Sequence, residues 1–188
     1  MKGRNRMAIL NDRNEETKGI IHLMITAKCD RNCPNCCNNQ YSLDDIPVVT
    51  DEELQEAHTI YLTGGEPFAY GHPTILARRL KNKYPNIKTI RVYTNAFELG
   101  NYLVQGWDLD DIDGLTISIK DNRDKYAFEN IIIKAKEVLK LKSNWVYVFS
   151  GFEDIECPKE FNKKVRQWQK IFVAAPNSIF RKIPKMDK

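Results

Sequence analysis

The chain has 188 residues, of which 42% are hydrophobic and 29% charged, and its formal net charge is +4. This length and composition predict one globular domain that buries a core, and no apolar stretch is long enough for a membrane span. The mild charge does not indicate nucleic acid as a partner, because much of the basic excess lies near the two ends.

Apolar, β-branched runs alternate with helical patterns along the chain. Strands are predicted at 20–25, 59–62, 89–93, 115–119, 146–149 and 171–174. Helices are predicted at 51–57, 73–83 and 124–141. The apolar stripe of the last helix comprises Phe128, Ile131, Ile132, Ala135, Val138 and Leu139.

This alternation predicts an α/β fold with parallel strands, in which ligands bind beyond the carboxyl ends of the strands. Six strands are fewer than the eight of a closed TIM barrel, so we expect an open, partial (βα)6 barrel. We expect a polar N-terminal segment over residues 1–18, the barrel domain over 19–175 and a basic C-terminal tail over 176–188.

Three cysteines follow the first predicted strand with the spacing C-x3-C-x2-C: Cys29, Cys33 and Cys36. Three thiolates on one loop bind three irons of a cubane iron-sulfur cluster and leave the fourth iron open. The alternative is a zinc site whose fourth ligand is Cys37, Cys157 or a histidine, and the spacing alone does not exclude it. Cys37 is interpreted as a spare thiol, and Cys157 alone provides too few ligands for a second cluster. Five cysteines and the absence of a signal peptide favour a cytoplasmic location.

A glycine-rich turn follows the second predicted strand, in the sequence Thr63-Gly64-Gly65-Glu66-Pro67. Two glycines let the backbone approach a ligand and present N–H groups to it, and the adjacent carboxylate is an acceptor for an ammonium group. The cysteine triplet followed by this GGEP turn resembles the radical S-adenosylmethionine superfamily. The chain is also similar in size to the small members of that superfamily that activate glycyl-radical enzymes.

The resemblance implies that the three cysteines bind a 4Fe-4S cluster, whose open iron binds the methionine amino and carboxylate groups of S-adenosylmethionine. It implies further that Gly64, Gly65 and Glu66 receive the methionine ammonium. Asn35 stands where the family often has an aromatic residue that packs near the adenine, so how this chain holds the adenine is left open.

Three polar residues at the ends of later strands are weaker candidates for cofactor contact. Asn95 follows the third predicted strand, where family members have a similar Thr-Asn-Gly, and a turn asparagine is the alternative. Ser118 and Lys120 close the fourth strand on one face. The resemblance implies that polar residues at this level contact the ribose or carboxylate of the cofactor; a solvated edge lysine is the alternative for Lys120. His22 is expected to be packed or edge-exposed within the first strand. Trp168 is expected to be a core or interface anchor.

The resemblance implies reductive cleavage of S-adenosylmethionine to a 5′-deoxyadenosyl radical that abstracts hydrogen from a substrate, with a flavodoxin- or ferredoxin-type electron donor. A partial barrel on so short a chain needs a cover, so a protein or peptide substrate is expected first. A small molecule or nucleobase precursor, such as a 7-deazaguanine pathway intermediate, is the alternative within the class. A non-catalytic metal-binding adaptor is the alternative from another class.

Overall fold

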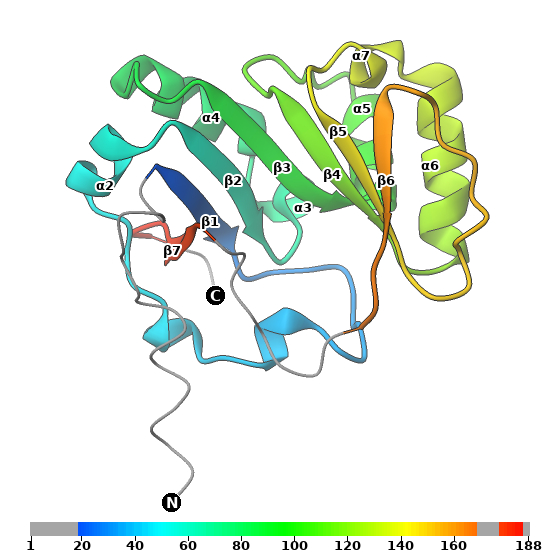
Figure 1. Cartoon of the computed structure of the whole chain (residues 1–188), viewed down its shortest axis with the longest axis horizontal. Helices are drawn as coiled ribbons and strands as arrows, with labels where there is room; N and C mark the ends of the chain where they lie inside the picture. The colour runs from blue at the N-terminus through cyan, green and yellow to red at the C-terminus, as the bar shows by residue number, and fades with distance from the viewer. Residues whose placement is uncertain (1–18, 169–176, 186–188) are drawn as a thin grey trace, which may run out of the picture.

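One sheet organises the computed structural model, which describes residues 19–168 and 177–185. Within these residues the sheet has seven strands, all parallel, in the order β6-β5-β4-β3-β2-β1-β7 (Figure 1). The strands are β1 (Ile20–Thr26), β2 (Thr59–Gly64), β3 (Thr89–Asn95), β4 (Gly114–Ile119), β5 (Asn144–Val148), β6 (Phe161–Val165) and β7 (Ile179–Lys182). The helices are α2 (Asp51–Glu56), α3 (Pro67–Tyr70), α4 (Pro73–Lys83), α5 (Ala96–Val104), α6 (Asn122–Lys134) and α7 (Lys136–Leu139). Two short 3-10 helices, η2 (Cys37–Asn39) and η3 (Leu43–Asp45), follow β1.

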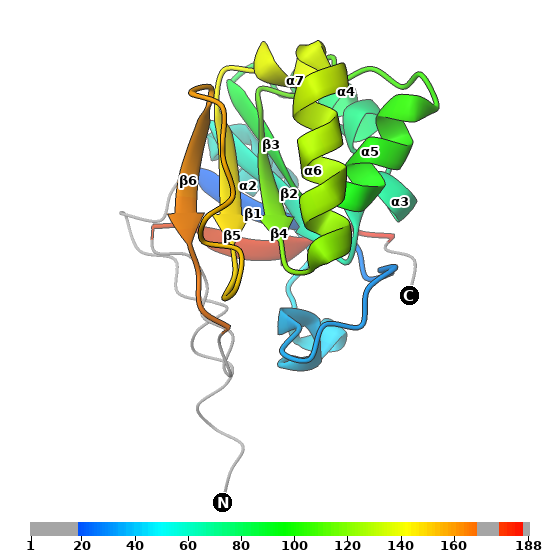
Figure 2. The same ribbon diagram turned by 90° about the vertical axis from the view of Figure 1, so that its right-hand side faces the viewer.

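The first six strands lie side by side in chain order, which determines where the helices go. Right-handed crossovers between parallel strands in a constant direction place every connecting helix on the same face of the sheet. Figure 2 shows α4, α5 and α6 in one layer on that face, whereas none of these three described helices lies on the opposite face. A doubly wound sheet reverses its strand order and carries helices on both faces. The architecture is therefore α/β with a singly wound parallel sheet, and it is compatible with a partial barrel.

The two faces of the sheet differ in chemistry because side chains alternate along each strand. On the helix-covered face, Leu115, Ile117 and Ile119 of β4 are fully buried in one core with Leu99 of α5 and Phe128 of α6. On the opposite face most side chains are aromatic or polar: His22, Tyr61, Arg91, Tyr93, Thr116, Trp145 and Tyr147. Met24 of β1 also lies on this face and is buried with Ile46 and Phe180 in a second, smaller cluster. The main core therefore lies between the sheet and the helices.

Thr116 offers a test of this packing. Its side chain is fully buried beside Tyr93 and Trp145, and its hydroxyl has no hydrogen-bond partner among the described residues. Because an unpaired buried hydroxyl destabilises a fold, Thr116→Val is expected to raise the free energy of unfolding by about 1 kcal/mol. Thr94→Val is the matched control, since the Thr94 hydroxyl donates to Glu66 Oε1 at 2.6 Å. Denaturant unfolding should show the two substitutions acting in opposite directions; equal destabilisation would contradict the assignment.

The strands β1 to β5 confirm the first five predicted strands, whereas the sheet also contains two strands that were not predicted, β6 and β7. Residues 171–174, predicted as the sixth strand, lie outside the described residues. Instead β6 covers Phe161–Val165, of which only Phe161 is buried. β7 pairs with β1, although its residues were expected in the basic tail. Arg181 of β7 is buried and paired with Glu53 of α2, with 3.0 Å between Nε and Oε1, so its charge is part of the packing.

Two predicted helices are confirmed as α2 and α4, and the third is interrupted. The chain leaves the helical conformation at Ala135, which has φ −102° and ψ 71°, and this separates α6 from α7. The sequence did not predict α3 or α5, which directly follow the GGEP turn and Asn95. Among the helices of the described chain, none has the length and apolar character needed to cross a bilayer.

Candidate active site

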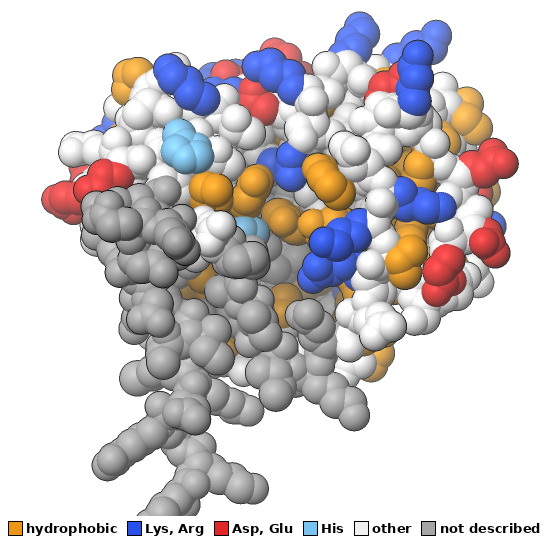
Figure 3. Space-filling model, viewed as in Figure 1, with side chains coloured by type: hydrophobic (Ala, Val, Ile, Leu, Met, Phe, Trp, Pro, Cys, Tyr) orange, Lys and Arg blue, Asp and Glu red, His pale blue; other side chains and the backbone are white. Residues whose placement is uncertain are grey.

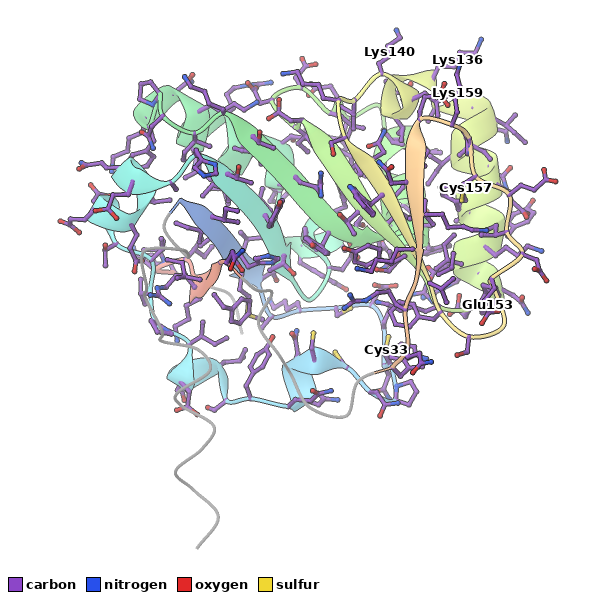
Figure 4. The ribbon with its side chains drawn as sticks, in the orientation of Figure 1. Cys33, Lys136, Lys140, Glu153, Cys157 and Lys159 are labelled. Carbon is purple, nitrogen blue, oxygen red and sulfur yellow. The ribbon has the colours of Figure 1, made fainter. Side chains whose placement is uncertain are left out.

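A cavity of about 450 Å³ lies at the carboxyl ends of the strands. Parallel strands bring these ends to one edge of the sheet, and Cys33 lies at that edge in Figure 4. All the residues predicted as cofactor or metal contacts line this cavity: Cys29, Cys33, Cys36, Gly64, Gly65, Glu66, Asn95, Ser118 and Lys120. The structure therefore brings together residues from four separate segments of the chain.

The three cysteines lie on the loop that leaves β1. A turn in which the Cys36 N–H donates to the Cys33 carbonyl at 3.1 Å orders the second half of this loop. All three side chains are half-buried, and their sulfurs are free thiols. In the described part of the chain, no three metal-binding side chains are already arranged around one point. The donor set fits a thiolate-bound metal, and gathering the three sulfurs requires a local rearrangement of the loop.

The thiols differ in how readily they ionise. Burial raises the pKa of Cys29 to about 11 and also raises that of Cys33. A hydrogen bond with Cys37 lowers the pKa of Cys36 to about 6. The ammonium of Lys120 favours the thiolate at each of the three positions. Since metals bind thiolates, Cys36 is the thiol best prepared to bind first.

A charged network ties the cysteine loop to the start of α6. Arg31, which is almost fully buried, forms ion pairs with Asp121 and Asp124. The neighbouring Asp30 accepts a hydrogen bond from Asn95 Nδ2 at 3.0 Å. Asp124 is completely buried, and burial raises its pKa to about 6 although Arg31 opposes the shift. This network was not predicted from the sequence. Its signal there is the Asp30-Arg31 pair between two of the cysteines, together with two acidic residues at a helix start.

The GGEP turn packs directly against the beginning of the cysteine loop. The Gly65 N–H donates to the Thr26 carbonyl and the Glu66 N–H donates to the Lys28 carbonyl, both at 2.8 Å. A Cβ atom on Gly64 would lie 2.1 Å from the Thr26 oxygen, and one on Gly65 would lie 1.8 Å from the Lys28 oxygen. The expectation that the N–H groups in this turn face a ligand is therefore wrong for Gly65 and Glu66. The glycines instead allow two backbone segments to touch.

Glu66 joins the turn to the end of β3. Its carboxylate accepts hydrogen bonds from Thr94 Oγ1 at 2.6 Å, from the Asn95 N–H at 2.8 Å and from the Phe68 N–H at 3.1 Å. Burial raises the pKa of Glu66 to about 7, whereas these three donors favour the ionised form. A carboxylate has about four lone-pair positions, so these contacts leave one for a ligand ammonium.

The three weaker candidates for cofactor contact, Asn95, Ser118 and Lys120, differ in whether their side chains already have partners. Asn95 caps α5, since its Oδ1 accepts from the Glu98 N–H at 2.9 Å, and its amide also contacts Asp30. This is the turn role weighed from the sequence, although the residue also lines the cavity. Ser118 and Lys120 line the cavity from the end of β4. Within the described chain the Lys120 ammonium has no ion pair, so its charge is available to a ligand.

Segments without a sequence signal complete the walls of the cavity. Tyr41 and Phe180, with ring centroids 5.6 Å apart, line it from the loop after η2 and from β7. Arg166 and Trp168 line it from the segment that follows β6. Asn35 lines the cavity without contributing a ring. Residues from several segments therefore contribute to the walls of the cavity, and a cover provided by a large substrate or partner stays a prediction.

His22 lies on the face of the sheet opposite the helices, and it also lines the cavity. Its ring contacts Tyr61 edge-on at 4.7 Å between centroids, and burial lowers its pKa to about 4. Between pH 6.5 and 4 the unfolded chain therefore binds a proton at this position that the folded chain does not. We expect this residue to remove at most about 3 kcal/mol of stability as the pH falls through that range. His22→Phe keeps the ring contact and should lose less stability over the same range; equal losses in denaturant titrations would contradict the assignment.

Comparisons of the chain with protein-family models, with curated proteins and with solved structures find no match. Function is therefore inferred from the chemistry of the cavity. That cavity combines three thiols, a buried carboxylate and an ammonium without an ion pair among the described residues, at the carboxyl ends of parallel strands.

Proposed function

We propose that this protein is a radical S-adenosylmethionine enzyme. The observation that carries the proposal is the junction between the cysteine loop and the GGEP turn, which two backbone hydrogen bonds hold against each other on one cavity wall. Three soft ligands and an acceptor for an ammonium then face the same space. A structural zinc site explains the thiols but gives no reason for the adjoining turn and cavity.

Cys29, Cys33 and Cys36 would hold a 4Fe-4S cluster, which when bound supplies the electron for reductive cleavage of S-adenosylmethionine and so a radical for hydrogen abstraction. The remaining lone pair of Glu66 would accept a hydrogen bond from the amino group of the cofactor, and the Lys120 ammonium would pair with its carboxylate. Ser118 would form a hydrogen bond with the ribose. A flavodoxin- or ferredoxin-type protein is proposed as the electron donor.

The walls of the cavity favour a small substrate. Rings from both edges of the sheet, including Tyr41, Phe180 and Trp168, line the space that a reactive radical would occupy. Excluding water from that space prevents side reactions of the radical. We therefore place a small-molecule substrate before the protein or peptide substrate that chain length alone suggested.

Anaerobic reconstitution with iron and sulfide tests the proposal. We expect about four irons and four sulfides per chain, with a broad visible absorption that a strong reductant bleaches. One tightly bound zinc per chain, with no iron taken up, would support the non-catalytic adaptor instead. A cluster with four protein ligands would also contradict the proposal, because it leaves no iron for the cofactor.

A further inference from the structure

Aromatic side chains form a strip across the face of the sheet that lies opposite the helices. We call His22, Tyr61, Tyr93 and Tyr147 the ring strip. Its successive ring centroids are 4.7, 6.0 and 6.2 Å apart, and its members come from β1, β2, β3 and β5. Three of them, His22, Tyr93 and Tyr147, line the floor of the cavity. Successive rings meet edge to face, at interplanar angles of 61°, 81° and 67°. This floor therefore offers ring faces and edges rather than the open backbone edges that bind extended peptides.

Two further rings line the same cavity. Phe149 follows β5 and Trp168 follows β6, and their centroids lie 4.5 Å apart at an angle of 34°. Figure 3 shows hydrophobic and basic side chains gathered around a hollow over the middle strands. Flat conjugated groups stack on surfaces of this kind.

The charge of the cavity is positive. Glu66 provides the only carboxylate among the described lining residues, and three hydrogen bonds already engage it. The low pKa of His22 keeps that ring neutral near pH 7. Lys120 and Arg166 have no ion pair within the described chain. The Arg166 guanidinium lies 5.2 Å from the Tyr147 ring centroid, so it stands beside the ring strip.

We infer that the ring-lined part of the cavity binds a small substrate in which a flat ring system carries an acidic group, with Arg166 as its counter-ion. This inference rests on the proposed function, because Lys120 is assigned there to the carboxylate of the cofactor. Arg166 is then the cation that remains for the substrate. A planar guanidinium forms paired hydrogen bonds with carboxylate or phosphate.

Matched probes test the inference on the reconstituted protein with S-adenosylmethionine in excess. The probes are 2-naphthoate, 2-naphthyl phosphate and the neutral 2-naphthamide, and calorimetry measures their dissociation constants. We expect at least one acidic probe to bind about tenfold more tightly than the amide. The naphthoate and phosphate arms distinguish a carboxylate substrate from a phosphorylated one.

The Arg166→Gln variant should lose that preference, binding the acidic probe about tenfold more weakly with little change for the amide. Arg166→Lys keeps the positive charge but not the planar guanidinium, so its affinity for the acidic probe should lie between those of the wild type and Arg166→Gln. Lys159→Gln removes the same charge at a site far from Cys33 in Figure 4, and it should bind as the wild type does. Circular dichroism verifies that the variants are folded.

Three results would overturn the inference: equal affinity for acid and amide, unchanged binding in Arg166→Gln, or displacement of the probe by S-adenosylmethionine. The last would assign the rings to the adenine of the cofactor. Probe binding without S-adenosylmethionine cleavage would refute the proposed function alone. Cleavage without probe binding would refute this inference alone.

Discussion

Replacing Cys33 with alanine is expected to reduce iron and sulfide binding to background and to abolish cleavage of S-adenosylmethionine. Cys33 is the middle of the three thiols on the cavity wall. A cubane cluster bound through three of its irons needs one cysteine for each of them, so the two remaining thiolates would not hold it. Iron content after anaerobic reconstitution, together with product formation, measures the loss. The effect should be complete rather than partial, because each of the three thiolates is needed to hold one iron.

Cys157→Ala is the matched control for this substitution. Cys157 lies beside α6, at a distance from Cys33 that Figure 4 makes clear, and burial raises its pKa. This variant should keep both the cluster and the cleavage activity. Cys37→Ala should also keep the cluster if Cys37 is a spare thiol. An active Cys33→Ala protein, or a Cys157→Ala protein without iron, would show that the ligands have been wrongly assigned.

The second large effect is expected from Gly65→Ala. The new Cβ would lie 1.8 Å from the Lys28 carbonyl oxygen and 2.8 Å from that of Ala27, and both are backbone atoms. Because backbone cannot move away as a flexible side chain can, we expect the free energy of unfolding to fall by about 3 kcal/mol or more. The GGEP turn should also separate from the cysteine loop, and affinity for S-adenosylmethionine should fall. Denaturant unfolding and calorimetry measure the two effects.

Gly100→Ala provides the comparison within the same chain. Gly100 lies in α5, and a Cβ there would lie 3.8 Å from Ile131 Cδ1, which is an ordinary contact. Alanine in a helix interior is favoured over glycine by about 0.5–1 kcal/mol, so this variant should be as stable as the wild type or more so. Equal stability of the two variants would mean that the close approach at Gly65 is not part of the fold.

The fold was predictable where hydrophobic periodicity was strong. β1 to β4 carry aliphatic residues on the helix-covered face, which the sequence shows as β-branched runs. β6 reads Phe-Asn-Lys-Lys-Val and buries only Phe161, so hydrogen bonding to β5 determines this strand rather than burial. β7 is only four residues long and reads Ile-Phe-Arg-Lys, and its buried Arg181 is paired with Glu53 of α2. Stabilisation by residues that are distant along the chain leaves no local pattern in a sequence.

The candidate site was predictable as a set of residues but not as a set of contacts. The cysteine spacing and the GGEP turn identified segments that the structure places around one cavity. The use of the Gly65 and Glu66 N–H groups depends on where the Thr26 and Lys28 carbonyls lie, which only the fold determines. Trp168 was expected to be an anchor, yet it lines the cavity mouth beside Phe149. Single rings on alternate strand positions become a surface only when neighbouring strands are in register.

Incubation of the reconstituted protein with S-adenosylmethionine and a strong reductant, without oxygen, tests the central claim most directly. Chromatographic quantification of 5′-deoxyadenosine and methionine is the measurement. The account predicts that both products form in equal amounts even without substrate, and that neither forms without reductant. A protein with a full complement of iron and sulfide that binds no S-adenosylmethionine and forms neither product would contradict it.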